Sequence, residues 1–418
     1  MTSRTRAMLL VGALLFSGQA TAETLPQAIA SAWATNPELA AARARQEALA
    51  EAPEQARAAG RPVAELGGNT GYDRFGYGRS GSAGVTASLP IWTGGRVSSA
   101  VRAAKGEVAA GAQQLRDAEA AVLQRVVLAY AGLLYNQQAV EVARVGIERL
   151  DRQVAEAQLR FDLGQATRTD VAQLQAQRAS VAADLADAEG SLAATRAAYR
   201  AVVGQDAGAL SPEVTPSRRL PPSLADARDA AQHANPLLLA QDRIVEASAS
   251  RIDQTRAEGA PAVDLAGGYA RGLRDAGGDL RGFEGAASVG AVLRVPLLTG
   301  GLVSSRIRQA EASWRAERFQ RDAAAREALR GADADWADLV AAQGRLRAGI
   351  DGLAAADLAL KGVRAEYALG LRSTIDILIA DQSLRAAQLD VARARADVLT
   401  AEAALLRTTG RLDADAFR

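Results

Sequence analysis

The chain has 418 residues, with 49 basic and 48 acidic side chains, no cysteine, one histidine and 4% aromatic residues. The balanced charge argues against a nucleic-acid-binding protein, which would carry a clear basic excess. Without cysteine the chain cannot form disulfides, iron–sulfur clusters or thiolate zinc sites, and we expect neither a metal nor a cofactor. A mean hydropathy of -0.06 is too low for a bundle of membrane helices, because the apolar excess is largely alanine among charged residues.

The first 22 residues have the pattern of a secretory signal. Two arginines precede a ten-residue apolar run, 7–16, and Ala20-Thr21-Ala22 supplies a small-residue cleavage site. The run is too short to span a bilayer, which takes about 20 apolar residues. We therefore expect an exported mature chain that begins at Glu23 and carries 47 basic and 48 acidic side chains.

Two long stretches of the chain lack proline. Residues 91–211 and 297–418 contain none of the 12 prolines, and both stretches are rich in strong helix formers. Because proline costs about 3 kcal/mol inside a helix, these stretches predict long helices, the first from about Gly95 to Arg160. Apolar residues recur every seven positions there, with mostly small residues three positions on, which indicates a coiled-coil seam. The series is Val126, Leu133, Val140, Ile147 and Val154.

The second half of the chain repeats the first at an offset of 206 residues. Pro-x-x-Thr-Gly-Gly occurs at 90–95 and at 296–301, and Phe161-x-x-Gly164 corresponds to Tyr367-x-x-Gly370. We expect a signal peptide at 1–22 and two repeats, 23–222 and 223–418. Each repeat would hold a shorter helix (about 24–60, then 223–259), a β-hairpin, the long helix and a helix of about 40 residues. The heptad series returns as Ala332, Leu339, Leu346, Leu353, Leu360 and Tyr367.

A Gly-rich stretch in each repeat alternates between apolar and polar positions. In the first, Ala64 and Leu66 share one face of the predicted strand, and Val63 and Glu65 share the other. Strands of about ten residues with one weakly apolar face and one polar face suit a membrane β-barrel. Two soluble hairpins attached to coiled coils would give a similar pattern.

The number of strands needed to close a barrel indicates how many copies of the chain assemble. Four strands cannot close a barrel, and an open sheet edge is not tolerated in lipid. Eight strands would enclose only side chains, so about twelve are needed for a pore. We therefore predict an α+β membrane protein. It would be a homotrimer with a 12-stranded barrel, four strands from each chain, continued by a long α-helical coiled-coil barrel.

The export signal, the duplication, the hairpins and the long helices resemble the TolC-like outer-membrane efflux proteins over essentially the whole mature chain. The most specific shared elements are the Pro-x-x-Thr-Gly-Gly motifs and the Phe/Tyr-x-x-Gly breaks. The resemblance implies a trimer in the outer membrane, with its barrel in lipid and its helical tunnel in the periplasm. It also implies a passive exit duct for an inner-membrane transporter, which is joined to it through a periplasmic adaptor protein. Such proteins catalyse no reaction.

The resemblance further implies roles for residues at the ends of the long helices. Asp376 matches an aspartate that lines a constricted periplasmic entrance, where three carboxylates near a threefold axis would attract cations. Some relatives carry a second acidic residue three positions later. That position is Ile379 here, and Asp381 lies two residues further on. The sequence therefore does not decide whether a second acidic ring forms.

Two more sets of residues follow from the same resemblance. Thr169 and Asp170 match the first side of a latch that holds the entrance shut, and Tyr367 and Arg372 match the second side. The turns that follow the long helices match the tips on which the adaptor docks. These turns comprise Leu163, Gly164, Gln165, Leu369, Gly370 and Leu371.

Three other functions compete with a drug or metabolite efflux duct. The same duct could serve type I protein secretion, because the transporter selects the cargo. A soluble periplasmic adaptor or coiled-coil scaffold would also use long helices, although adaptors usually carry one hairpin between β-domains. An enzyme has the least support, because the sequence shows no catalytic constellation.

Overall fold

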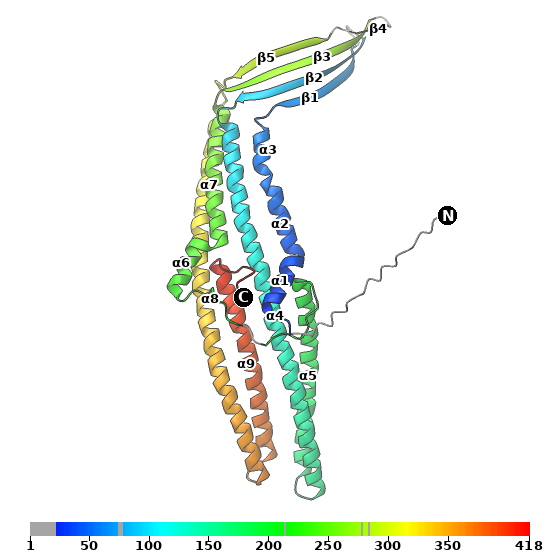
Figure 1. Cartoon of the computed structure of the whole chain (residues 1–418), viewed down its shortest axis with the longest axis vertical. Coiled ribbons are helices and arrows are strands. Elements are labelled where there is room, and N and C mark those ends of the chain that lie inside the picture. Colours follow the sequence, from blue (N-terminus) through cyan, green and yellow to red (C-terminus); the bar gives the residue numbers. More distant parts are fainter. Residues whose placement is uncertain (1–21, 74–77, 213–214, 277–278, 283–284) are drawn as a thin grey trace, which may run out of the picture.

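The computed structural model describes residues 22–418 except 74–77, 213–214, 277–278 and 283–284. Residues 1–21 of the expected signal peptide lie outside the described residues. The chain forms an elongated bundle of helices with a tilted antiparallel sheet at one end (Figure 1). In both repeats, a set of shorter helices leads into the sheet and two long helices follow it.

The two repeats contain corresponding elements. The first comprises α1 (Leu25–Thr35), α2 (Pro37–Ala50), α3 (Ala52–Ala58), β1 (Val63–Asp73), β2 (Gly78–Trp92), α4 (Arg96–Asp162) and α5 (Arg168–Val203). The second comprises α6 (Leu224–Ala234), α7 (Pro236–Arg256), η1 (Ala257–Gly259), β3 (Ala262–Ala276), β4 (Asp279–Gly282), β5 (Ala286–Arg294), α8 (Leu302–Ala368) and α9 (Thr374–Thr408). Both α4 and α8 have 67 residues and begin 206 positions apart, which confirms the duplication.

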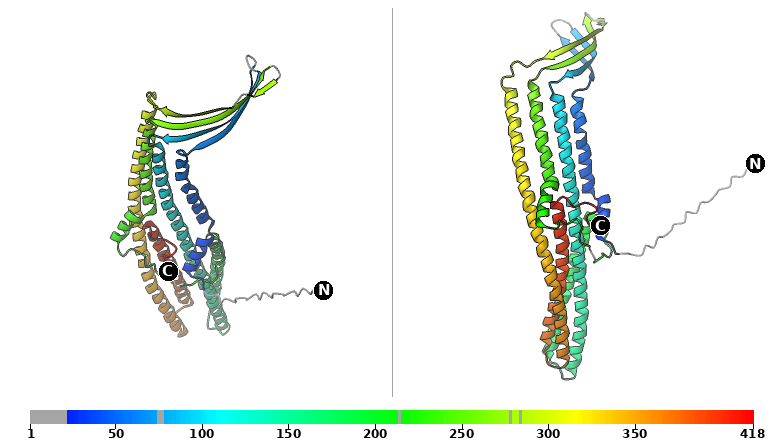
Figure 2. Two further views of the ribbon diagram at one scale, coloured as in Figure 1. Left: turned by 45° about the horizontal axis from the view of Figure 1, so that its top comes forward. Right: turned by 60° about the vertical axis from the view of Figure 1, so that its left-hand side comes forward.

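The helices form two levels along the bundle. Near the sheet, α8, α7, α4 and the α2–α3 segment lie side by side, whereas the far half contains α8, α9, α4 and α5 (Figure 2). Among the described helices, only α4 and α8 pass through both levels. Heptad residues of α4 such as Val126 and Leu133 are buried in this packing, as the seven-residue spacing predicts.

The shorter helices differ from the single helices expected at 24–60 and 223–259. Asn36 and Asn235 interrupt them, and the proline that follows each asparagine begins a new helix. The Asn36 side chain accepts hydrogen bonds from the N–H groups of Glu38 at 2.9 Å and Leu39 at 3.3 Å. Because proline disfavours a helical residue before it and asparagine caps a helix well, each Asn-Pro pair divides the predicted helix.

The sheet has an apolar face and a more polar face. It runs β1-β2-β3, and both β4 and β5 pair with β3, so β1 and β5 lie at its edges. Residues paired across antiparallel strands share a face. One such row consists of Leu66, Val85, Tyr269 and Ala287. The adjacent row, on the opposite face, consists of Glu65, Thr86, Gly268 and Ser288.

The Pro-x-x-Thr-Gly-Gly motifs connect the sheet to the long helices. Gly94 and Gly95 have φ values of +60° and +87°, and Gly300 and Gly301 have values of +58° and +80°. Side chains other than glycine rarely adopt this left-handed backbone. The consecutive glycines therefore turn the chain from the strand direction into the helix axis in both repeats.

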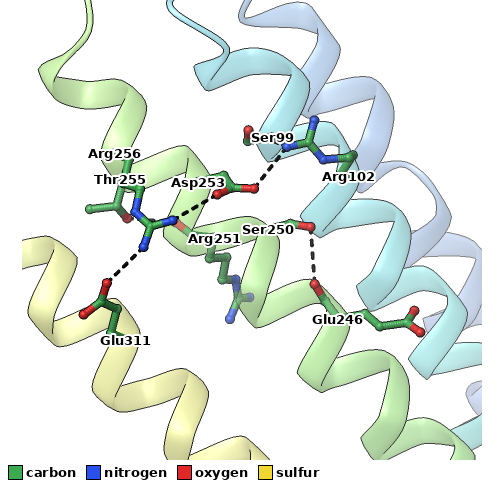
Figure 3. A network of polar contacts seen from close by, with 9 residues as sticks. All are labelled: Ser99, Arg102, Glu246, Ser250, Arg251, Asp253, Thr255, Arg256 and Glu311. Atoms are coloured by element: carbon green, nitrogen blue, oxygen red, sulfur yellow. Dashed lines mark hydrogen bonds and ion pairs between the residues drawn. The ribbon is translucent and has the colours of Figure 1, made fainter.

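Salt bridges join three helices close to the sheet. Arg102 of α4 lies 3.5 Å from Asp253 of α7, and Arg256 of α7 reaches Glu311 of α8 at 3.0 Å (Figure 3). All four side chains are substantially exposed, so each pair contributes little to stability. The network links α4, α7 and α8 close to the sheet.

The main hydrophobic core lies at the middle of the bundle, where the helices change partners. Tyr130 of α4 is fully buried there and donates hydrogen bonds of 3.0 Å to the carbonyl oxygens of Glu23 and Ser211. The residues after Gly410 return to this level and bury Leu412 and Phe417 in the same core. The N-terminal segment, described residues of the linker between repeats and the C-terminal tail thus pack together at this level.

Candidate functional site

The ends of α4 and α8 opposite the sheet have the same turn. Gly164 has a φ of +73°, and its N–H donates to Phe161 O at 2.9 Å while that of Gln165 donates to Arg160 O at 2.8 Å. In the second repeat, Gly370 has a φ of +74°, and Leu371 N–H donates to Glu366 O at 3.0 Å. This pair of bonds is a Schellman motif, which satisfies the last carbonyl groups of a helix. Each Phe/Tyr-x-x-Gly sequence is therefore a helix stop.

Asp170 and Asp376 lie in the first turns of α5 and α9, the helices that follow these turns. The Asp170 carboxylate accepts hydrogen bonds from Thr167, and the Asp376 carboxylate accepts bonds of 2.9 and 2.8 Å from Ser373 N–H and Oγ–H. These are capping boxes with aspartate in the third helical position. Hydrogen bonds from Thr167, and from Thr374 of the other helix pair, lower the pKa of Asp170. Hydrogen bonds from Ser373 and the charge of Arg372 lower the pKa of Asp376.

Within one chain, the four expected latch residues do not meet one another. The Tyr367 ring lies 4.9 Å from the Arg160 guanidinium of α4, a contact between the two helix pairs. Arg372 Nε donates to Glu366 at 2.7 Å, inside its own pair. Thr169 is exposed. Contacts between the pairs at this level include Arg160 with Tyr367, Asp170 with Thr374, and Leu378 of α9 packed against Val171 and Leu174 of α5.

Asp381 is buried between the two helix pairs, with 1% of its surface exposed. Its carboxylate accepts hydrogen bonds from Arg149 of α4 and, at 3.1 Å, from Arg385 of α9. Arg364 Nη2 of α8 lies 3.8 Å away. A carboxylate enclosed in this way cannot form a second acidic ring in an open passage. The four-residue spacing of Asp381 and Arg385 predicts a contact between them on one face of a helix. No sequence pattern predicts the contact of Asp381 with Arg149, which is 232 residues away.

Large apolar side chains are exposed at both tips. Leu163 is 64% exposed, and Leu369 and Leu371 are 76% and 71% exposed. Gly164, Gln165 and Gly370 are exposed beside them. Exposed leucines grouped at one end of a molecule are typical of a protein-binding surface.

A family model for outer membrane efflux proteins matches residues 28–205 and 227–411, one segment in each repeat. The chain belongs to the outer membrane efflux protein family. The chain is 32% identical to the outer membrane efflux protein BepC of Brucella suis over 414 residues, which cover 98% of this chain and 90% of BepC. It is 28% identical to the outer membrane protein TolC of Vibrio cholerae, over 94% of this chain and 91% of that protein.

A solved structure confirms the fold of the efflux protein. The crystal structure of the outer membrane protein VceC from Vibrio cholerae superposes with a TM-score of 0.77 at 23% identity, covering 92% of this chain and 96% of VceC. The fold is therefore TolC-like, with two repeats that each contribute a hairpin and long helices. The chain is a non-enzymatic channel of the outer membrane that serves tripartite efflux or type I secretion. Family membership excludes the soluble scaffold considered above.

Proposed function

We propose that three copies of this efflux protein form one exit duct, a 12-stranded barrel continued by a helical tunnel through the periplasm. The observation that carries the proposal is the sheet, which has one apolar face and edge strands β1 and β5. In lipid, the unpaired N–H and C=O groups of an edge strand would each cost several kcal/mol. Pairing β1 of one copy with β5 of the next removes every edge and directs the apolar face to lipid.

We also propose that the helical tips carry the entrance of the duct, with Asp376 of each chain at its constriction. Three carboxylates near the axis would attract cations and disfavour anions. In the trimer their mutual repulsion would oppose the hydrogen bonds from Ser373, which lower the pKa within one chain.

The Asp376→Asn variant tests the constriction, because asparagine can still accept the capping hydrogen bonds while losing the charge. Asp226→Asn is the matched control, since Asp226 is also the third residue of its helix, α6, and accepts a hydrogen bond from the N-cap residue Ser223 away from the tips. We expect Asp376→Asn to reduce the cation over anion permeability ratio by at least about twofold in bilayer recordings, with less effect from Asp226→Asn. Equal ratios in the wild type and Asp376→Asn would remove Asp376 from the constriction.

The exposed tip leucines are proposed to dock a periplasmic adaptor that links the duct to an inner-membrane transporter. Docking would cover Leu163, Leu369 and Leu371, which are otherwise in contact with water, and burial of each would contribute about 1–2 kcal/mol. Leu369→Ala/Leu371→Ala should therefore weaken in-cell cross-linking to the adaptor encoded beside the cognate transporter. Leu237→Ala, an exposed leucine of α7 away from the tips, is the control. Undiminished cross-linking of the double variant, with intact trimers, would place the docking surface elsewhere.

The latch is proposed to hold the two helix pairs together at the entrance. Within one chain, Arg160 with Tyr367 and Asp170 with Thr374 bridge the pairs. Thr169 and Arg372 lie on the exposed surface beside them, where a neighbouring copy in the trimer can reach them. Such contacts are directional and individually weak, about 0.5–3 kcal/mol each, so rotation of one helix pair could break them.

A further inference from the structure

A cavity of about 480 Å³ lies between the two helix pairs, at the level between Asp381 and the tips. Helices α4 and α8 supply the basic side chains on its wall, and the first turn of α9 contributes Thr374 and Ile377. The arginines that line it are Arg149, Arg152, Arg160 and Arg364. Of the described residues lining the cavity, only Glu156 is acidic.

The positive charge around this cavity is not balanced. Arg149, Arg364 and the adjacent Arg385 share one carboxylate, that of Asp381. Arg160 pairs with Glu156 at 2.7 Å. Arg152 has no ion pair in the part of the chain that the structure describes. Five guanidinium groups therefore face two carboxylates.

Two further observations indicate that this excess of positive charge is unfavourable. Burial and the neighbouring charges of Arg149 and Arg152 lower the pKa of Arg364, although Asp381 acts in the opposite direction. Beside the cavity, Arg385 Nη2 is buried and makes no hydrogen bond to the described residues. Crowded cations at a partly enclosed site repel one another more strongly than they would in water. An anion in the cavity would relieve this repulsion.

We propose that the cavity between the helix pairs binds a tetrahedral oxyanion, sulfate or phosphate, through Arg149, Arg152 and Arg364. Planar guanidinium groups donate paired hydrogen bonds to such oxygens, and bonds of this kind are stronger than those between neutral groups. The volume holds the ion together with bound water, because each water occupies about 30 Å³ in the liquid. Since α4 and α8 belong to different helix pairs, the bound ion would join the pairs. This binding goes beyond the duct function and does not require a latch.

Equilibrium dialysis of the detergent-solubilised mature chain against radiolabelled sulfate tests the site, with chloride added to keep the ionic strength constant. We expect saturable binding of about one sulfate per chain. Arg152→Gln/Arg364→Gln should weaken it by roughly tenfold or more, because two charge-assisted donors are lost. Arg308→Gln, an exposed arginine of α8 outside the cavity, removes a charge of the same kind and should leave binding unchanged.

Two results would overturn the proposal. The first is no saturable binding by the wild type, as expected if a carboxylate of a neighbouring copy fills the cavity in the trimer. The second is equal binding by the wild type and the double variant. Helical circular dichroism and trimer mobility must match between variants, and Arg152→Gln alone, at an exposed position, gives the same test if the double variant fails to fold.

Discussion

Glu402 of α9 is a carboxyl group buried at the middle of the bundle, with 2% of its surface exposed. It lines a cavity of about 490 Å³ together with apolar residues such as Leu134 and Leu399, and with Arg395. Its hydrogen bond from Ser217 N–H is long, 3.4 Å. Burial raises the pKa of Glu402 to about 7, an effect that this bond only partly opposes.

The raised pKa predicts a pH dependence of stability. Between about pH 4.5 and 7 the folded chain retains a proton that the unfolded chain has released, so the free energy of unfolding falls as pH rises. The loss would be about 3 kcal/mol per chain at most. Glu402→Gln should abolish this part of the dependence and raise the melting temperature at pH 8. Thermal unfolding followed by circular dichroism at pH 5 and pH 8 measures it.

The exposed Glu148→Gln variant of α4 provides the control, since it also removes one carboxylate but none from the core. An identical change in melting temperature between pH 5 and pH 8 in the wild type and Glu402→Gln would contradict the assignment.

The contacts and burial of single residues are the features that the sequence predicts least well. The positions of Asp170 and Asp376 follow the repeat, and their helix-capping role is local, so spacing alone reveals it. Asp381, in contrast, lies near a predicted acidic constriction in sequence but is enclosed by Arg149 and Arg385. Its burial depends on how α4 packs against α9, which a heptad pattern in one helix does not specify.

Helices and strands are easier to predict from the sequence than the roles of single residues. Proline-free stretches, heptads and glycine motifs are local patterns, so they can be recognised without knowledge of the tertiary packing. The first long helix, α4, ends within about two residues of the expected boundary at Arg160, where a Schellman turn stops it. The shorter helices were predicted as single segments, yet Asn36-Pro37 and Asn235-Pro236 divide them. The Asn-Pro pair in each repeat is the local sequence signal for this division.

The paired glycine turns allow a comparison between repeats. A Cβ added at Gly94 would lie 2.4 Å from Ala260 Cβ, whereas one added at Gly300 would meet open space. Both positions have positive φ, so alanine should cost about 1–2 kcal/mol of strain in each. Gly94→Ala should cost about 1–3 kcal/mol more through overpacking. Melting temperatures of the two variants measure the difference, and equal losses would show that the steric contact is absent.

At the scale of the whole molecule, the duplication places both tips at one end and the whole sheet at the other (Figure 1). One chain provides an open sheet and two helix pairs, none of which encloses a passage alone. Assembly of copies around an axis is therefore the step that would create the duct, and contacts between helix pairs would set the width of its entrance.

Single-channel conductance in planar lipid bilayers tests this account most directly. The mature chain 23–418 would be compared with Tyr367→Leu/Arg372→Ser, which removes the ring that contacts Arg160 and the charge beside Asp376. Tyr135→Leu/Arg393→Ser is the matched control, because these residues make a similar ring–guanidinium contact of 5.5 Å away from the tips. We predict small, steady pores in the wild type and the control, and wider pores in the tip variant. Equal conductance in all three would contradict the latch, and no pores from verified folded trimers would contradict the proposed duct.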